Sequence, residues 1–171
     1  MELGSFKISG HSTKREWSVY LFVAKPKKEK DKIKLYVGKV GDNRAGCNPV
    51  ISRVGNHFSH NKVHSQIRNA IKETVEYDYE YFYCHCGEYK KEDKRRSENC
   101  SRINELEREL NRVVQNQIEN KQNFELLNPY KGNHISKLRN KKRSQLINDE
   151  EREVLSKLVE TALTTTTVNR Q

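Results

Sequence analysis

Residues 17–24 read WSVYLFVA, an apolar run that no charged residue interrupts. β-branched and aromatic side chains dominate it, and extended strands favour these residue types. A strand turns successive side chains to opposite faces, so a run that is apolar throughout needs cover on both of them. We therefore expect residues 17–24 to form the central strand of a sheet that is packed on both sides.

Two further segments have the pattern of strands. Residues 33–40, IKLYVGKV, follow the lysine-rich connection KPKKEKDK, which predicts a hairpin with a long loop. Residues 75–83, VEYDYEYFY, place Val or Tyr at every second position, the period of a strand. The three segments predict a small, mostly antiparallel, three-stranded sheet.

Helical periodicity accounts for most of the remaining chain. Apolar residues recur at helical spacing after Pro49, within residues 62–72, from residue 101 to about 117, and within residues 149–163. The threonine-rich end, TTTTVNRQ, lacks such a pattern, and we expect it to be disordered. The order strand-strand-helix-helix-strand-helix, followed by a basic segment and a last helix, predicts an α+β fold with helices flanking the sheet.

The charge of the chain favours a polyanionic partner. Its 171 residues carry a formal net charge of +10, and such a surplus attracts nucleic acid, although a merely basic soluble protein has the same composition. The beginning of the chain has no apolar run with a cleavage site, and no stretch approaches the roughly 20 apolar residues that span a bilayer. We expect a cytoplasmic protein without membrane contact, with cysteines as thiols.

The two hairpin strands carry motifs that resemble the signatures of the GIY-YIG nucleases. Ser18-Val19-Tyr20 keeps the tyrosine of the first signature and lacks its glycine. Tyr36-Val37-Gly38 matches the second, and Lys39 follows it as in the excision-repair members. Further residues match the family along the next helices: Arg53 and His57, spaced as in the restriction endonucleases, and Glu107, where the family keeps its metal-binding glutamate. The resemblance covers roughly residues 16–120.

The resemblance implies a DNA endonuclease that hydrolyses phosphodiester bonds with one Mg²⁺ or Mn²⁺ ion per active site, held by Glu107. The catalytic set that it implies is Tyr20, Tyr36, Lys39, Arg53, His57 and Glu107. The chain departs from the family in two places. The connection between the first two strands is longer and richer in lysine, and the asparagine that often follows the glutamate by about three turns has no clear counterpart.

The chemistry of these side chains agrees with those roles. Hydrolysis of a phosphodiester needs a deprotonated water, stabilisation of the developing charge and correct placement of the groups. Tyr20 and Tyr36 lie on adjacent predicted strands, so their hydroxyls can face one phosphate, and nearby cations and a metal ion would favour a phenolate. Arg53 can bind a phosphate through two hydrogen bonds. His57, one helical turn later, can exchange a proton with the attacking water.

Helical geometry also singles out Glu107. At about 100° per residue, Glu107 lies closest to the apolar stripe of its helix, whereas Glu105 and Glu109 point further toward water. A carboxylate beside the core is unfavourable unless it is paired or bound to a metal ion. Hard Mg²⁺, which retains several waters, suits a single carboxylate.

Two basic clusters are candidates for contact with double-stranded DNA. One is near Tyr20 in the hairpin connection and contains Lys25, Lys27 and Lys28. The other lies in the segment KGNHISKLRNKKR and contains Lys131, Lys137, Arg139, Lys141, Lys142 and Arg143. We divide the chain into a flexible N-terminus at residues 1–14, a nuclease-like domain at 15–120, and a basic segment with a last helix at 121–171. The last part packs on the domain or contacts DNA, and on a symmetric site the protein can act as a homodimer.

The cysteines allow a second interpretation. Cys84, His85, Cys86 and Cys100 offer zinc ligands, but their spacing differs from standard zinc motifs, so we expect buried or idle thiols and keep structural zinc as the alternative. The sequence Gly38-Lys39-Val40-Gly41 lacks phosphate-loop spacing, which argues against a nucleotide cofactor.

Several functions therefore compete. Spacing of Arg53 and His57 favours an enzyme that restricts foreign DNA, and a mobile-element or repair nuclease is the alternative within the same class. A DNA-binding module that has lost cleavage and a zinc-stabilised interaction protein are the alternatives from other classes.

Overall fold

The computed structural model describes residues 1–41, 47–61, 63–90, 94–131 and 137–168, without the side chains of residues 137–140 and 167–168. It is an α+β fold built on one mixed four-stranded sheet of strand order β3-β1-β2-β4. The described elements are a 3-10 turn η1 (Gly10–Thr13), β1 (Glu16–Pro26), β2 (Ile33–Val40), α1 (Val50–Phe58), α2 (Gln66–Ala70), a second 3-10 turn η2 (Thr74–Glu76), β3 (Tyr77–Glu88), α3 (Arg96–Ile118), β4 (Phe124–Leu126), α4 (Lys137–Ser144) and α5 (Asp149–Val168).

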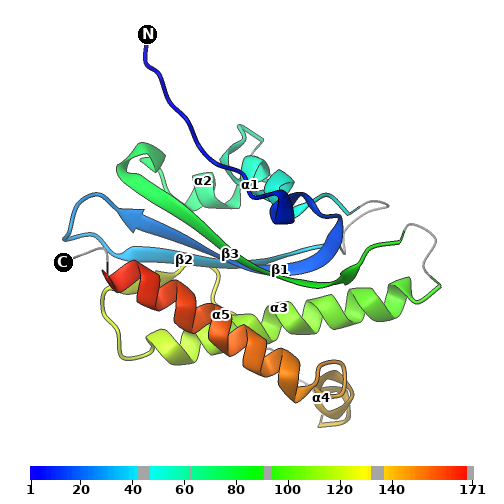
Figure 1. Ribbon diagram of the computed structural model, residues 1–171. Helices are drawn as coiled ribbons and strands as arrows, with labels where there is room; N and C mark the ends of the chain where they lie inside the picture. The colour runs from blue at the N-terminus through cyan, green and yellow to red at the C-terminus, as the bar shows by residue number, and fades with distance from the viewer. Residues whose placement is uncertain (42–46, 62, 91–93, 132–136, 169–171) are drawn as a thin grey trace.

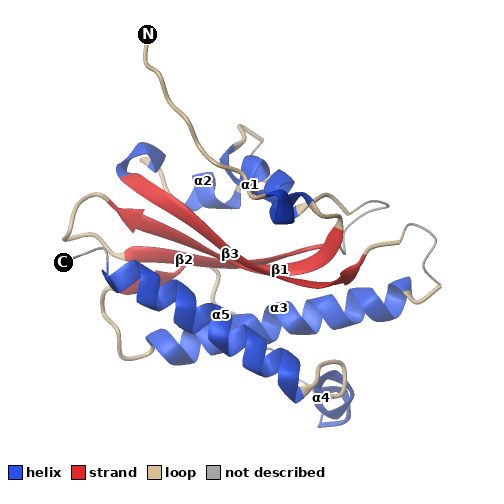
Figure 2. Ribbon diagram, viewed as in Figure 1, coloured by secondary structure: helices blue, strands red, loops and turns tan. Residues whose placement is uncertain are grey.

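The sheet is the middle layer of three (Figures 1 and 2). Helices α1 and α2 lie on one face, and α3 and α5 lie on the other. Strand β1 is buried from residue 17 to 24, as the unbroken apolar run predicts. On the α1 face Phe22 contacts the rings of Phe58, Tyr79 and Tyr81, while Leu21 belongs to the opposite face of the same strand.

The prediction of three strands is wrong, because β4 adds a fourth. This short strand follows α3 and pairs in parallel with the beginning of β2, through Ile33, Lys34 and Leu35. The sheet is therefore mixed, although β1 pairs antiparallel with both β2 and β3. Three residues are too few to show a period of two in the sequence, so the pattern gave no signal.

Asn128 extends the edge that β4 begins. Its side-chain amide donates to the carbonyl of Val37 at 2.7 Å, and its Oδ1 accepts from the amide of Val37 at 3.0 Å. Asn111 of α3 fixes this segment in turn, because its amide donates to the carbonyl of Asn128 at 2.9 Å. The side chain of Asn128 thus takes the place of one more strand residue beside β2.

The helices differ from the sequence pattern mainly at their ends. Helix α2 is only Gln66–Ala70, and Val63, which we expected on its apolar face, is 73% exposed. Helix α5 continues to Val168, so the expectation of disorder is wrong for Thr164 to Thr166 and the backbone of the next two residues. Thr165 and Thr166 donate their hydroxyls to carbonyls four residues earlier, which keeps these polar groups satisfied inside the helix.

Helix α5 and the 3-10 turn η1 are placed against the core. Helix α5 packs against α3, β3 and β1. At the N-terminus, η1 brings His11 against the ring of Tyr83, with 3.1 Å between Nδ1 and the hydroxyl oxygen. Within the described residues, no helix combines the length and the apolar character that crossing a bilayer requires.

Candidate active site

A pocket of about 330 Å³ lies at the outer edge of β2, where the two layers of helices meet around the sheet. Strand β4 pairs only with Ile33–Leu35, and Asn128 only with Val37, so beyond that point no described strand covers this edge. Tyr36 and Gly38 belong to the face of β2 that carries α1, and Lys39 belongs to the face that carries α3. The pocket lining contains Tyr36, Gly38, Lys39, Arg53, Val63, His64, Gln66 and Glu107.

Lys39 and Glu107 connect β2 to α3 inside this pocket. The Lys39 ammonium donates to Oε2 of Glu107 at 2.6 Å, and both side chains are mostly buried, at 17% and 28% exposure. It also donates to Oδ1 of Asn104 at 2.5 Å. Asn104, one helical turn before Glu107, is a site residue that sequence reasoning missed, because its role depends on a contact with a distant strand.

Arg53 reaches the pocket from α1 and lies next to Tyr20 and Tyr36. Its Nε is buried and has no hydrogen-bond partner among the described residues. The guanidinium also hydrogen-bonds the Tyr20 hydroxyl, and it keeps its positive charge in the pocket, where it can bind a phosphate. Of the described cations in this lining, Arg53 is therefore the one best placed to receive a phosphate oxygen.

Tyr20 and His57 lie behind the pocket, not in its wall. Both are fully buried, and the Tyr20 hydroxyl is 2.8 Å from Nε2 of His57. The Tyr36 ring bridges to this pair, because its centroid lies 5.1 Å from that of His57 and 6.5 Å from that of Tyr20. The structure thus brings the two predicted tyrosines together, and of the two only Tyr36 lines the pocket.

The protonation of this buried pair differs from our expectation of a phenolate. Burial raises the pKa of Tyr20, the neighbouring Tyr36 hydroxyl adds to the rise, and the charge and hydrogen bond of Arg53 oppose only part of it. Burial likewise raises the pKa of Tyr36, and the Glu107 carboxylate adds to the effect. Burial and the charge of Arg53 lower the pKa of His57 to about 4. In the free protein, Tyr20, Tyr36 and His57 are therefore neutral at neutral pH.

Glu105 is the clearest error in our reading of α3. We expected it to point toward water, yet it is 3% exposed and pairs with Arg108 at 2.5 Å and with Arg112 at 3.5 Å. Two arginines offset the burial of this carboxylate. Glu107 is less buried than Glu105, and what distinguishes it is its place in the pocket beside Lys39.

The lysines of the hairpin connection lie away from the pocket. Lys25 pairs with Glu80 at 2.9 Å, and Lys28 pairs with Glu76 at 3.1 Å. Lys27 donates to the carbonyl of Val75. All three lie at the end of the β1–β2 hairpin opposite to Gly38 and Lys39, so they are not beside the pocket and part of their charge is neutralised.

The basic segment is described only in part. Lys131 is exposed, as are Lys141 and Lys142 on α4, whereas Arg143 is half-buried and its Nη1 is buried without a described partner. The side chains of Lys137 and Arg139 lie outside the described residues. In Figure 1, α4 lies beyond the N-terminal end of α5, on the side of the α3–α5 layer away from α1 and α2.

The donor set of the pocket fits one hard divalent cation. Glu107 supplies a partly exposed carboxylate whose Oε2 accepts from the Lys39 ammonium, and the amide oxygen of Asn104, one turn away on the same helix, accepts from the same ammonium. Mg²⁺ is commonly held by one or two carboxylates together with waters and phosphate oxygens. Among the described residues, no group of three or more His, Cys, Asp or Glu side chains converges as a metal site, and His85 faces away from Cys84 and Cys86.

Comparison of the chain with family models, with curated proteins and with solved structures found no match.

Gly38 is required by the close approach of Tyr20. A Cβ at this position would lie 2.3 Å from the Tyr20 hydroxyl oxygen, and that oxygen is held by His57. Gly38→Ala should lower the free energy of unfolding by about 1–3 kcal/mol, the usual effect of overpacking a core. Gly55→Ala on α1 is the matched control, since a Cβ there meets nothing within 4 Å. Urea unfolding measures both, and equal stabilities would contradict the packing argument.

The neutral state of His57 should make stability depend on pH. A folded-state pKa of about 4 lies below the ordinary value of 6.5, so the unfolded chain binds the proton more readily. The stability linked to His57 is fully present above about pH 6.5 and is lost as the pH falls toward 4, by up to about 3 kcal/mol. Unfolding free energies of wild type and His57→Gln measure this loss as their difference, and exposed His60→Gln is the control. A difference that stays constant between these pH values would contradict it.

Proposed function

We propose that this protein is a metal-dependent endonuclease that hydrolyses phosphodiester bonds in double-stranded DNA. The observation that carries the proposal is the pocket at the open edge of β2, where Tyr36, Lys39, Arg53 and Glu107 converge from three elements. These are residues that the resemblance to GIY-YIG nucleases singles out, and they come from segments far apart in the sequence. The net charge of +10 suits a polyanionic substrate.

Each pocket residue has a separate role in hydrolysis. Arg53 binds the scissile phosphate and stabilises the charge that develops on its oxygens. Tyr36, the tyrosine at the pocket surface, is the first group to exchange a proton with the attacking water. Tyr20 and His57 stand behind it as a neutral hydrogen-bonded pair, and their rings fix its orientation.

Lys39 and Asn104 keep Glu107 in place. The ion pair with Lys39 holds the carboxylate toward the pocket, and Asn104 holds the ammonium from its other side. When bound, Mg²⁺ or Mn²⁺ would contact Glu107 and supply charge for the phosphate and acidity for a coordinated water.

Restriction of foreign DNA is the biological role that we favour. The support is the one-turn spacing of Arg53 and His57, which resembles the restriction branch. A mobile-element or repair nuclease uses the same chemistry on another DNA substrate. Mapping of the cut ends distinguishes them, because a restriction enzyme cuts at a short defined sequence.

Incubation of supercoiled plasmid with the full chain and Mg²⁺ or Mn²⁺ tests the proposal. We expect nicked or linear DNA, and no cutting when a chelator is added. Glu107→Gln keeps the shape of the side chain but removes its charge, so it should abolish cutting while DNA binding, measured by fluorescence anisotropy, persists. Glu98→Gln is the control, since it makes the same change of charge at an exposed position near the start of α3 and should remain active.

The outcomes separate the two parts of the proposal. No cutting by the wild-type chain with either ion would reject the nuclease function, whereas full activity of Glu107→Gln would reject only the assignment of the metal ligand. Glu105→Gln is unsuitable as a control, because the structure buries this residue between two arginines.

Contact between α4 and the DNA backbone predicts a change in salt dependence. Each phosphate contact contributes roughly 0.9 to the slope of log affinity against log salt. Replacing the exposed pair Lys141 and Lys142 with Ala should therefore flatten the slope by about two and weaken all sequences alike, since phosphate contacts carry no sequence information. The control is the same double change at Lys90 and Lys94, which removes equal charge elsewhere. Equal slopes in the two variants would show that α4 is only a solvated surface.

A further inference from the structure

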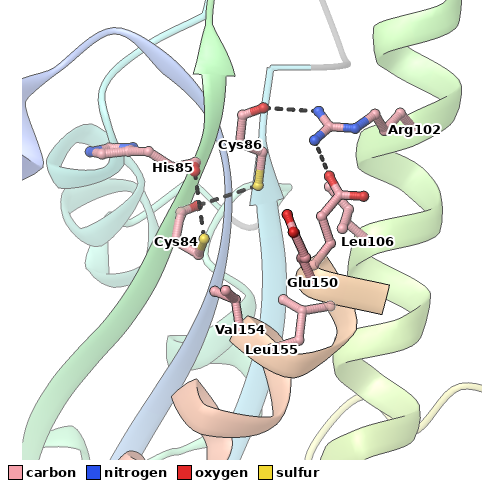
Figure 3. A pocket seen from close by; sticks show the side chains of 9 residues that line it. Cys84, His85, Cys86, Arg102, Leu106, Glu150, Val154 and Leu155 are labelled. Carbon is pink, nitrogen blue, oxygen red and sulfur yellow. Dashed lines mark hydrogen bonds and ion pairs between the residues drawn. The ribbon is translucent and has the colours of Figure 1, made fainter. Parts of the chain in front are cut away.

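A second pocket, of about 250 Å³, lies on the other face of the sheet between β3, α3 and the start of α5 (Figure 3). Cys84 and Cys86 of β3 line it together with apolar side chains of the two helices. His85 points to the opposite side, where its ring nitrogens lie 2.8 Å from Oγ of Ser18 and 3.0 Å from the carbonyl of His11. The pocket therefore presents two thiols, while the ring of His85, which also belongs to the lining, is engaged by Ser18 and His11.

The backbone of β3 is irregular at this pair. His85 pairs with Ser18 and Gly87 pairs with Trp17, so Cys86 is the extra residue of a β-bulge. Its carbonyl accepts a hydrogen bond from Arg102 of α3 at 2.8 Å. The extra residue of a bulge is not fixed by ladder pairing, which leaves the backbone room to adjust when a bond forms between the sulfurs.

The two thiols differ in their chemistry. Cys86 Sγ donates to the Cys84 carbonyl and Cys84 Sγ donates to the His85 carbonyl, each at 3.5 Å. The neighbouring Cys86 thiol lowers the pKa of Cys84 to about 7, with burial and Glu151 opposing and Arg102 assisting. The Cys84 thiol in turn raises the pKa of Cys86. Cys84 therefore forms a thiolate more readily than Cys86, and the thiolate is the nucleophile.

We propose that Cys84 and Cys86 form an oxidisable dithiol that hydrogen peroxide converts into a reversible intramolecular disulfide. The Cys84 thiolate attacks one peroxide oxygen, the O–O bond breaks, and the departing hydroxide takes up a proton as water, leaving Cys84 as a sulfenic acid. The Cys86 sulfur then attacks the Cys84 sulfur, the S–O bond breaks, and the hydroxide leaves as water with the Cys86 proton. Two electrons pass from the dithiol to the peroxide.

The pocket favours peroxide over an anionic disulfide such as glutathione disulfide. Glu150 and Glu151 line the entrance, and Arg102 is already engaged by the Cys86 carbonyl and by Glu151. A carboxylate-bearing oxidant meets like charge there, whereas neutral peroxide does not.

The test uses the reduced full-length chain, exposed to peroxide, then alkylated and analysed by peptide mass spectrometry. We expect a Cys84–Cys86 disulfide that dithiothreitol reverses, with Cys84 oxidised about tenfold faster than Cys100. Cys86→Ser should accumulate a sulfenic acid at Cys84 that dimedone traps, and Cys84→Ser should leave Cys86 unoxidised. Cys100→Ser is the matched control and should form the disulfide normally.

Equal oxidation of Cys84 and Cys100, or a disulfide to Cys100 or to a second chain, would overturn the proposal. Faster formation of a mixed disulfide with glutathione disulfide than of the internal disulfide with peroxide would overturn the choice of oxidant. The wild-type measurement stands even where a serine variant folds poorly, and none of these readouts requires DNA cleavage.

Discussion

Burial of β1 on both faces determines where a site can form in this molecule. The strand separates the α1 layer from the α3–α5 layer, so side chains of the two layers can meet only around an edge of the sheet. Strand β4 closes the outer edge of β2 for only three residues, and Asn128 extends the closure to Val37. Beyond that point Arg53 from one layer and Glu107 from the other approach the same opening. The candidate active site is thus a consequence of where β4 ends.

The spacing of apolar residues along the sequence predicted the long strands that pack against the core. Strand β2 has the predicted limits and β1 contains the predicted run, because strand periodicity extends over enough residues to be read. Strand β3 begins at Tyr77, inside the predicted range of residues 75–83, and continues past its predicted end to Glu88. Strand β4 is too short for any period, and its partner in β2 lies far away in the sequence. The threonines of α5 have weak helix propensity, yet hydroxyl bonds to earlier carbonyls and packing of Thr166 against the core outweigh it.

The sequence identified most of the residues of the candidate site, but it did not predict which of them contact one another. The angular positions of residues around α3 predicted that Glu107 is more buried than Glu105, which is wrong. Helix α3 packs against both the sheet and α5, so it buries more of its circumference than the single apolar stripe. The bonds of Lys39 to Glu107 and Asn104 cross between segments that no local rule connects. The need for glycine at Gly38 likewise appears only when the Tyr20 ring is in place.

The net charge of the pocket depends on the burial of the aromatic side chains in and behind it. Because burial keeps Tyr20, Tyr36 and His57 neutral, the described charges of the lining come from Lys39, Arg53 and Glu107. Lys39 and Glu107 largely cancel as an ion pair, so the positive potential that remains is centred on Arg53, whose Nε has no described partner. One guanidinium that has no described carboxylate partner, next to neutral aromatic side chains, suits a singly charged phosphodiester. The same burial that raises the pKa of the tyrosines therefore leaves Arg53 as the group that selects an anion.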